Sequence, residues 1–152
     1  MSLPVIENIA VNIKTTIDEI TVAEGYNQTL IALRSKRVDF NAEALDDLTV
    51  AIFQLEADKL ASAIGTYEWD QHFILMAIVV DSDDSTDPID TRRNQVKSDI
   101  IKKLRVDPSR GGYALDTDIA ATAMFKDEGI SGVAVEIAVH YRVNEDDPYT
   151  QA

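Results

Sequence analysis

The chain has 152 residues, 45% of them hydrophobic, and 27 acidic against 14 basic side chains give a formal net charge of −13. This length suits a single globular domain. The acidic balance argues against a sequence-independent grip on nucleic acid, because such a surface repels phosphate. It fits either a solvated surface that aids solubility or a wall along which DNA slides without sticking. The absence of cysteine excludes disulfides, thiolate metal sites and a cysteine nucleophile.

The first predicted element is a helix over residues 2–24. Isoleucines recur there at spacings of three and four residues, which is the period of one helical stripe. Pro4 near the start and Gly25 just past the end fit the usual asymmetry of helix termini. No export signal is visible, and no apolar run approaches the roughly 20 residues of a membrane helix, so we expect a soluble protein.

Three strands are predicted next. The first spans residues 28–40 and changes from apolar to basic, the second spans 48–56, and the third spans 66–80. The segment 57–64 could form a short helix or the base of a hairpin. The third strand becomes continuously apolar at Phe73, which indicates one half-exposed end and one end buried on both faces.

An acidic loop over residues 81–87 leads into the second predicted helix. Asp87 is expected to cap the free amides and Pro88 to occupy the first helical position. One apolar stripe runs along residues 89–104, and basic residues occupy much of the remainder. Three cations at the end of this helix suit the negative end of its dipole: Lys102, Lys103 and Arg105.

Two further strands, over residues 115–125 and 132–143, complete the predicted domain of residues 1–143. Along the last strand, large side chains at every second position from Val133 to Val143 share one face, and the other face carries Ala134, Glu136, Ala138, His140 and Arg142. Runs of adjacent strands favour antiparallel pairing. The sequence therefore predicts an α+β fold with a mainly antiparallel five-stranded sheet and two helices packed on one face, in the order α-β-β-β-α-β-β. Residues 144–152 are predicted to be an acidic, flexible tail.

Few residues suggest catalysis. Asp70 and His72 share one strand face, so the carboxylate could orient the imidazole, but no serine stands in a G-x-S-x-G context. A polar pair on a strand is the favoured interpretation. His140, beside Glu136 and Arg142, is interpreted as a surface histidine, and neither histidine has metal-ligand spacing. We predict no catalytic, cofactor-binding or metal-binding residue and expect that the protein is not an enzyme.

The acidic loop could coordinate a hard cation through its alternating oxygens. Counted as an EF-hand from Asp81, however, it has Thr86 where glycine is required and Arg92 where glutamate is required. Structural or adventitious binding of calcium or magnesium is the alternative to a solvated loop. The pair Gly111-Gly112 is not a phosphate cradle, because no strand leads directly into it and no G-K-[ST] follows.

A basic patch ends the first strand and comprises Arg34, Lys36 and Arg37. It is either a solvated strand end or a surface that meets the acidic surface of a neighbouring copy. In the second case unlike surfaces join head to tail, which produces a ring if the rotation closes.

Three stretches, together with the order of elements, resemble the tail terminator proteins of long-tailed bacteriophages, also called tail completion or minor tail proteins. The family similarly has a tryptophan opening its long central strand, a helix ending in an aspartate and a glycine pair, and a closing strand near a tyrosine and an acidic-proline tail. The stretches here are Thr66–Phe73 with the apolar run behind it, Leu104–Leu115, and Val133–Tyr141 followed by Asp147-Pro148-Tyr149.

The resemblance implies a homo-oligomeric ring, typically hexameric, that caps the tail tube, stops its polymerisation and offers an interface to the head connector. The implied partners are copies of the chain, which can be monomeric when free, the tail tube protein and the head connector. DNA passes through without specific binding, and no membrane or cofactor is involved. The implied location is the virion tail, after synthesis in the bacterial host cytoplasm.

The alternatives are another neck or head–tail joining component and a small metal-dependent enzyme. By position, we expect subunit or tube contacts at Arg34, Lys36, Arg37, Asp81, Asp83, Asp84 and Asp87.

Overall fold

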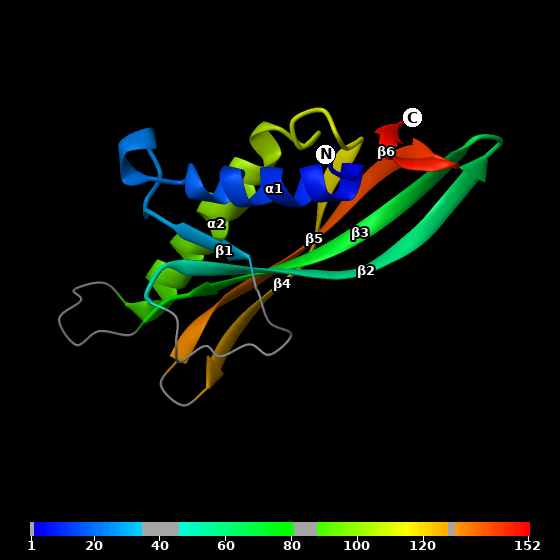
Figure 1. The fold of residues 1–152 in the computed structure, drawn as a ribbon. Coiled ribbons are helices and arrows are strands. Elements are labelled where there is room, and N and C mark those ends of the chain that lie inside the picture. The colour runs from blue at the N-terminus through cyan, green and yellow to red at the C-terminus, as the bar shows by residue number, and fades with distance from the viewer. Residues whose placement is uncertain (1, 35–45, 81–87, 128–129) are drawn as a thin grey trace.

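The computed structural model describes residues 2–34, 46–80, 88–127 and 130–152, and these form two α-helices and one sheet (Figure 1). No described helix combines the length and apolar character needed to cross a membrane. In chain order the elements are α1 (Val5–Asp18), the short 3-10 helix η1 (Val22–Glu24), β1 (Ile31–Arg34), β2 (Thr49–Ala63), β3 (Thr66–Ile78), α2 (Ile89–Val106), β4 (Asp116–Asp127), β5 (Ile130–Asn144) and β6 (Asp147–Gln151).

The strands form one mixed sheet in the order β1-β2-β3-β5-β4, with β6 paired to the end of β5. β1 runs parallel to β2, and every other pair is antiparallel. The fold is therefore α+β, as predicted, but the described sheet has six strands rather than five.

The sixth strand lies in the segment predicted to be a flexible tail. After a tight turn β6 folds back on β5, with Asn144 opposite Asp147 and Val143 opposite Gln151. The Gln151 side chain also donates a 2.6 Å hydrogen bond to the carbonyl of Gly112. Acidic composition does not prevent this pairing, because the ladder uses backbone groups that every non-proline residue carries.

The first helix is shorter than the predicted range of residues 2–24. α1 ends at Asp18, and η1 follows after a short break, closed by Gly25 at a positive φ of 91°. Both Ile17 and Ile20 are fully buried, so the apolar spacing continues across the break. Periodicity alone therefore could not locate the end of the helix.

The ambiguous segment 57–64 is mostly strand. β2 continues through Ala63 and pairs with β3 up to a two-residue turn, in which Gly65 has φ of 87°. Two register shifts interrupt the pairing, between Gln54 and Ala57 and between Lys59 and Ala61. Each extra residue changes which side chains share a face, and this disrupts the alternation by which a strand is recognised in sequence.

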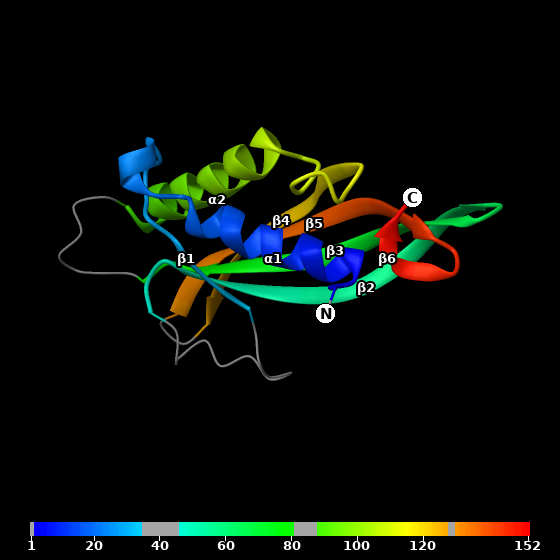
Figure 2. The ribbon, with the colours of Figure 1, turned by 45° about the horizontal axis from the view of Figure 1, so that its top comes forward.

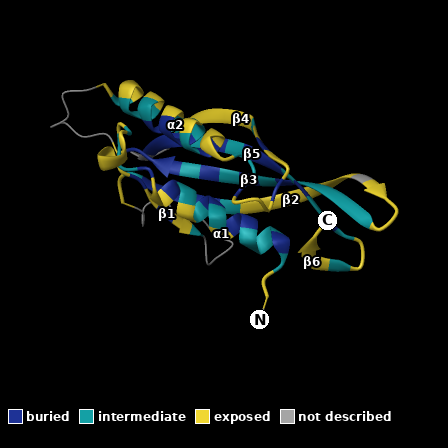
Figure 3. Cartoon of the chain, turned by 90° about the horizontal axis from the view of Figure 1, so that it is seen from above, coloured by how far each residue is buried: buried dark blue, intermediate teal, exposed yellow. Residues whose placement is uncertain are grey.

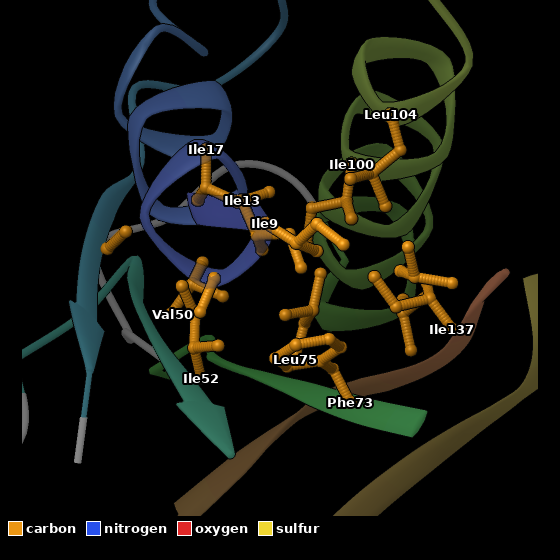
Figure 4. Packing of buried hydrophobic residues seen from close by; sticks show 14 of the residues in the cluster. Ile9, Ile13, Ile17, Val50, Ile52, Phe73, Leu75, Ile100, Leu104 and Ile137 are labelled. Carbon is orange, nitrogen blue, oxygen red and sulfur yellow. The ribbon is translucent and has the colours of Figure 1, made fainter. Parts of the chain in front are cut away.

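Both helices lie side by side on one face of the sheet, as predicted (Figures 1 and 2). Their buried stripes meet the apolar side chains of the central strands in a single core (Figures 3 and 4). Fully burying one such aliphatic side chain contributes roughly 1.5–3 kcal/mol, so this layer accounts for most of the stabilisation. Residues at its centre include Ile9, Ile13, Ile17, Ile100, Leu104, Val50, Ile52, Phe73, Leu75 and Ile137.

Two buried polar side chains fasten α2 to the rest of the domain. Asp99 accepts hydrogen bonds from the backbone amides of Asn27 (2.9 Å) and Gln28 (3.2 Å) and from the Asn27 side chain. Arg110 donates to the carbonyls of Leu104 and Asp107, and so caps the end of α2. Burial lowers the pKa of the Arg110 guanidinium.

The start of α2 differs from the prediction in one respect, because Pro88 occupies the N-cap position rather than the first helical position.

Candidate functional site

The side of the sheet opposite the helices carries the candidate site, and we call it the open face. Strand pairing places its side chains in rows across β3, β5 and β4. One row is Ile74, Glu136 and Ala121, and the next rows toward the β2–β3 turn are His72, Ala138 and Asp118, and then Asp70, His140 and Asp116. The open face therefore changes along the strands from apolar to acidic.

An open hollow lies in the acidic part of this face, and we call it the acidic hollow. It has a volume of about 370 Å³ and is lined by Leu55, Glu56, Asp58, His72 and Glu136. The imidazole of His72 lies among the carboxylates: its Nε2 is 3.6 Å from Asp58 Oδ2, and its Nδ1 is 3.6 Å from Glu136 Oε2. The hollow thus contains three carboxylates and one imidazole.

Asp70 adds a fourth carboxylate beside the acidic hollow. It lies opposite Asp58 in the β2–β3 ladder, and its Oδ2 is 4.0 Å from Nε2 of His72. Like charges at directly opposed positions of a sheet destabilise it. Among the described residues, no lysine or arginine forms an ion pair with Asp58, Asp70 or Glu136. This part of the open face is therefore suited to receive a cation.

The end of the open face near the β2–β3 turn is neutralised within the chain. Glu68 accepts hydrogen bonds from His140, at 3.1 Å, and from Arg142, whose Nε is 2.9 Å from Glu68 Oε1. The hydrogen bonds from Arg142 and then His140 hold the pKa of Glu68 below its usual value. The same neighbourhood thus contains one carboxylate paired with an arginine beside several that have no lysine or arginine partner among the described residues.

A second, smaller hollow of about 160 Å³ lies in the apolar part of the open face. Ile74 and Glu136 border it, and its floor is built from the small side chains of β4 and β5, including Ala121, Ala123 and Ala134. Leu55 extends this apolar area and is 40% exposed. The open face therefore offers both apolar area and charge, a combination typical of a protein interface.

The two histidines lie where strand alternation placed them. Asp70 and His72 share one face, and His140 lies on the same face as Glu136 and Arg142. The approach of Asp58 to His72 was missed, because Asp58 lies beyond the irregular part of β2 and no local pattern reveals its partner. Within the described ranges, no group of three or more histidine, cysteine or acidic residues is arranged to hold a metal ion.

Of the seven predicted contact residues, the structure describes Arg34. Its guanidinium forms a two-pronged ion pair with Glu7 of α1, at 2.6 and 3.2 Å. This pair holds the pKa of Glu7 below its usual value. Arg34 is therefore already neutralised inside the chain, while its role in assembly stays a prediction. The other six lie outside the described residues: Lys36, Arg37, Asp81, Asp83, Asp84 and Asp87.

The cations at the end of α2 differ in their partners. Lys103 pairs with Glu19 at 2.9 Å, and Arg105 pairs with Asp116 at 3.3 Å. The ammonium of Lys102 lies 5.2 Å from the centre of the Tyr26 ring and has no carboxylate partner among the described residues. Lys102 is therefore an exposed cation that lies over an aromatic ring and forms no ion pair with the described residues.

The chain matches no protein-family model and no curated protein sequence.

Proposed function

We propose that this chain is a structural subunit that assembles with copies of itself, and that it serves as the tail terminator of a long-tailed bacteriophage. The observation that carries the proposal is the open face. Helices cover one side of the sheet, whereas the opposite side presents exposed Leu55 and Asp58 and two open hollows. An apolar area rimmed by charge is what an interface requires.

Hydrogen bonds hold the β2–β3 turn at the end of the open face, which suits an assembly protein. At the β2–β3 turn, the Glu145 carboxylate accepts hydrogen bonds from the Gly65 amide and the Tyr67 hydroxyl, both at 3.2 Å. The Glu145 amide in turn donates to the Gly65 carbonyl at 2.9 Å. These bonds fasten the projecting end of the hairpin to the end of β5 (Figure 1). A surface ordered in advance loses less entropy when it binds.

Ring closure follows from contacts between unlike surfaces. When a surface of one copy binds a different surface of the next, the contact repeats and closes if the rotation allows it. A ring with the net charge of this chain, −13 for each copy, would repel DNA rather than hold it. The same ring would stop tube growth at one end and offer its other side to the head connector.

Two measurements test the proposal. Sedimentation velocity across a range of concentrations should reveal a discrete oligomer, with a hexamer as the expected size. Electron microscopy of the protein mixed with tubes of its tail tube protein should show one tube end capped. A chain that stays monomeric and leaves both tube ends bare would overturn the proposal, whereas capture by a head connector without tube binding would favour a head–tail joining component.

The enzyme alternative makes a different prediction for the acidic hollow. If His72 acted as a base oriented by a carboxylate, His72→Asn would abolish turnover and leave self-association intact. As an interface residue, His72 would instead affect association when replaced. Measuring the oligomer of His72→Asn beside that of the unaltered chain separates these roles.

A further inference from the structure

The exposed side of α2 becomes basic toward the end of the helix. Beyond the first turn, which carries the exposed Asp90, exposed positions of the helix include Asn94, Ser98, Lys102 and Arg105. Val106 follows them and is 68% exposed. The side chain of Lys102 has no carboxylate partner among the described residues. The last two turns of α2 therefore present an exposed apolar side chain and an ammonium that lies over the Tyr26 ring and has no carboxylate partner among the described residues.

The acidic hollow has the complementary properties. Glu56, Asp58 and Glu136 line it without a lysine or arginine partner in the described ranges, and the Asp58 side chain is 70% exposed. Leu55 supplies an apolar wall. A lysine side chain fits such a site, because its methylene stem packs on apolar surface while its ammonium stays among polar groups.

We infer that the last turns of α2 in one copy dock on the open face of the next copy, with Lys102 entering the acidic hollow. The inference rests on the self-assembly proposed above and specifies the contact that builds it. The ammonium reduces the repulsion between Asp58 and Asp70, and Val106 adds apolar contact near Leu55. Arg34, which is paired with Glu7 inside the chain, is not needed for this contact.

The two surfaces cannot meet within a single copy. α2 belongs to the helix layer (Figures 1 and 2), whereas His72 and Glu136, which line the acidic hollow, alternate along their strands with side chains buried under the helices. A chain of copies joined in this way therefore keeps one donor surface free at one end and one receptor surface free at the other. This is the head-to-tail arrangement that closes into a ring.

Charge exchange tests the contact. Lys102→Glu and Asp58→Lys, each made alone, should weaken self-association by roughly tenfold or more, because close interfacial charge pairs have coupling energies of this order. The double variant, and an equal mixture of the two single variants, should both recover most of the affinity. Lys126→Glu is the matched control, since it changes the net charge equally on exposed β4 and should have little effect.

Disulfide trapping supplies a second readout, because the chain contains no cysteine. Lys102→Cys mixed with Asp58→Cys should give a cross-linked pair under mild oxidation, whereas Lys126→Cys mixed with Asp58→Cys should not. Circular dichroism confirms that each variant is folded. An oligomer that survives Lys102→Glu unchanged and yields no cross-link overturns this contact alone. A chain that is monomeric at every concentration overturns both this contact and the proposed self-assembly.

Discussion

Replacing Asp99 by alanine should destabilise the fold by about 3–5 kcal/mol. The Asp99 side chain is 3% exposed and accepts three hydrogen bonds from Asn27 and Gln28, two of them from backbone amides. The variant leaves both amides without this acceptor, and a donor costs about 1–3 kcal/mol where water cannot replace the lost acceptor. The loss of packing around the removed carboxylate adds to this cost.

The assay is urea unfolding followed by circular dichroism, with the free energy of unfolding extrapolated to zero denaturant. Ser98→Ala on the same helix is the control, because Ser98 is exposed. The control should change stability by no more than about 0.5 kcal/mol. A cost below about 1 kcal/mol for Asp99→Ala would show that water replaces the carboxylate, and would refute the idea that Asp99 anchors α2.

Three further predictions concern stability. Gly132→Ala should prevent correct pairing of β5, because the added Cβ would lie 2.0 Å from the Ala77 carbonyl oxygen. The soluble yield and the melting temperature of this variant should fall sharply. A melting curve like that of the wild type would contradict the close approach. Arg110→Ala should cost about 3–5 kcal/mol in urea unfolding, since it removes the cap of α2 and leaves carbonyls unsatisfied; a cost under 1 kcal/mol would count against that role. The folded-state pKa of Glu7 is lowered, so its pair with Arg34 stabilises the fold above the unfolded pKa near 4.5, and this stabilisation is lost as pH falls through the folded pKa. Glu7→Gln should therefore lower the free energy of unfolding by about 0.5–1 kcal/mol at pH 7 but by little at low pH. A loss of stability that is independent of pH would rule this out.

Only part of the acidic hollow could be predicted from the sequence. Alternation along β3 and β5 was enough to place His72 and Glu136 on polar faces, because adjacent side chains of any strand point to opposite sides. It could not bring them together, since they come from strands far apart in the chain. Asp58 was harder still to place, because an irregular stretch of β2 separates it from the regular part of that strand.

For the basic residues, the sequence located the clusters, but the tertiary structure decided which cations form ion pairs. Composition revealed that cations gather at Arg34 and at the end of α2, but their availability depends on distant partners. Arg34 finds Glu7 on another element, whereas Lys102, within the described chain, finds no carboxylate. A charge pattern gives the sign of a surface, and only tertiary packing decides which charges are free to bind.

By itself, the sequence determined the class of fold, the number of α-helices and the approximate position of five of the six described strands, because these follow from local periodicity and turn residues. The tertiary structure decided the end of the first helix, the parallel pairing of β1, the strand formed by Asp147–Gln151 and the meeting of His72 with three carboxylates. These features depend on backbone and side-chain groups that lie far apart in the sequence, and local pattern contains no record of which of them become neighbours.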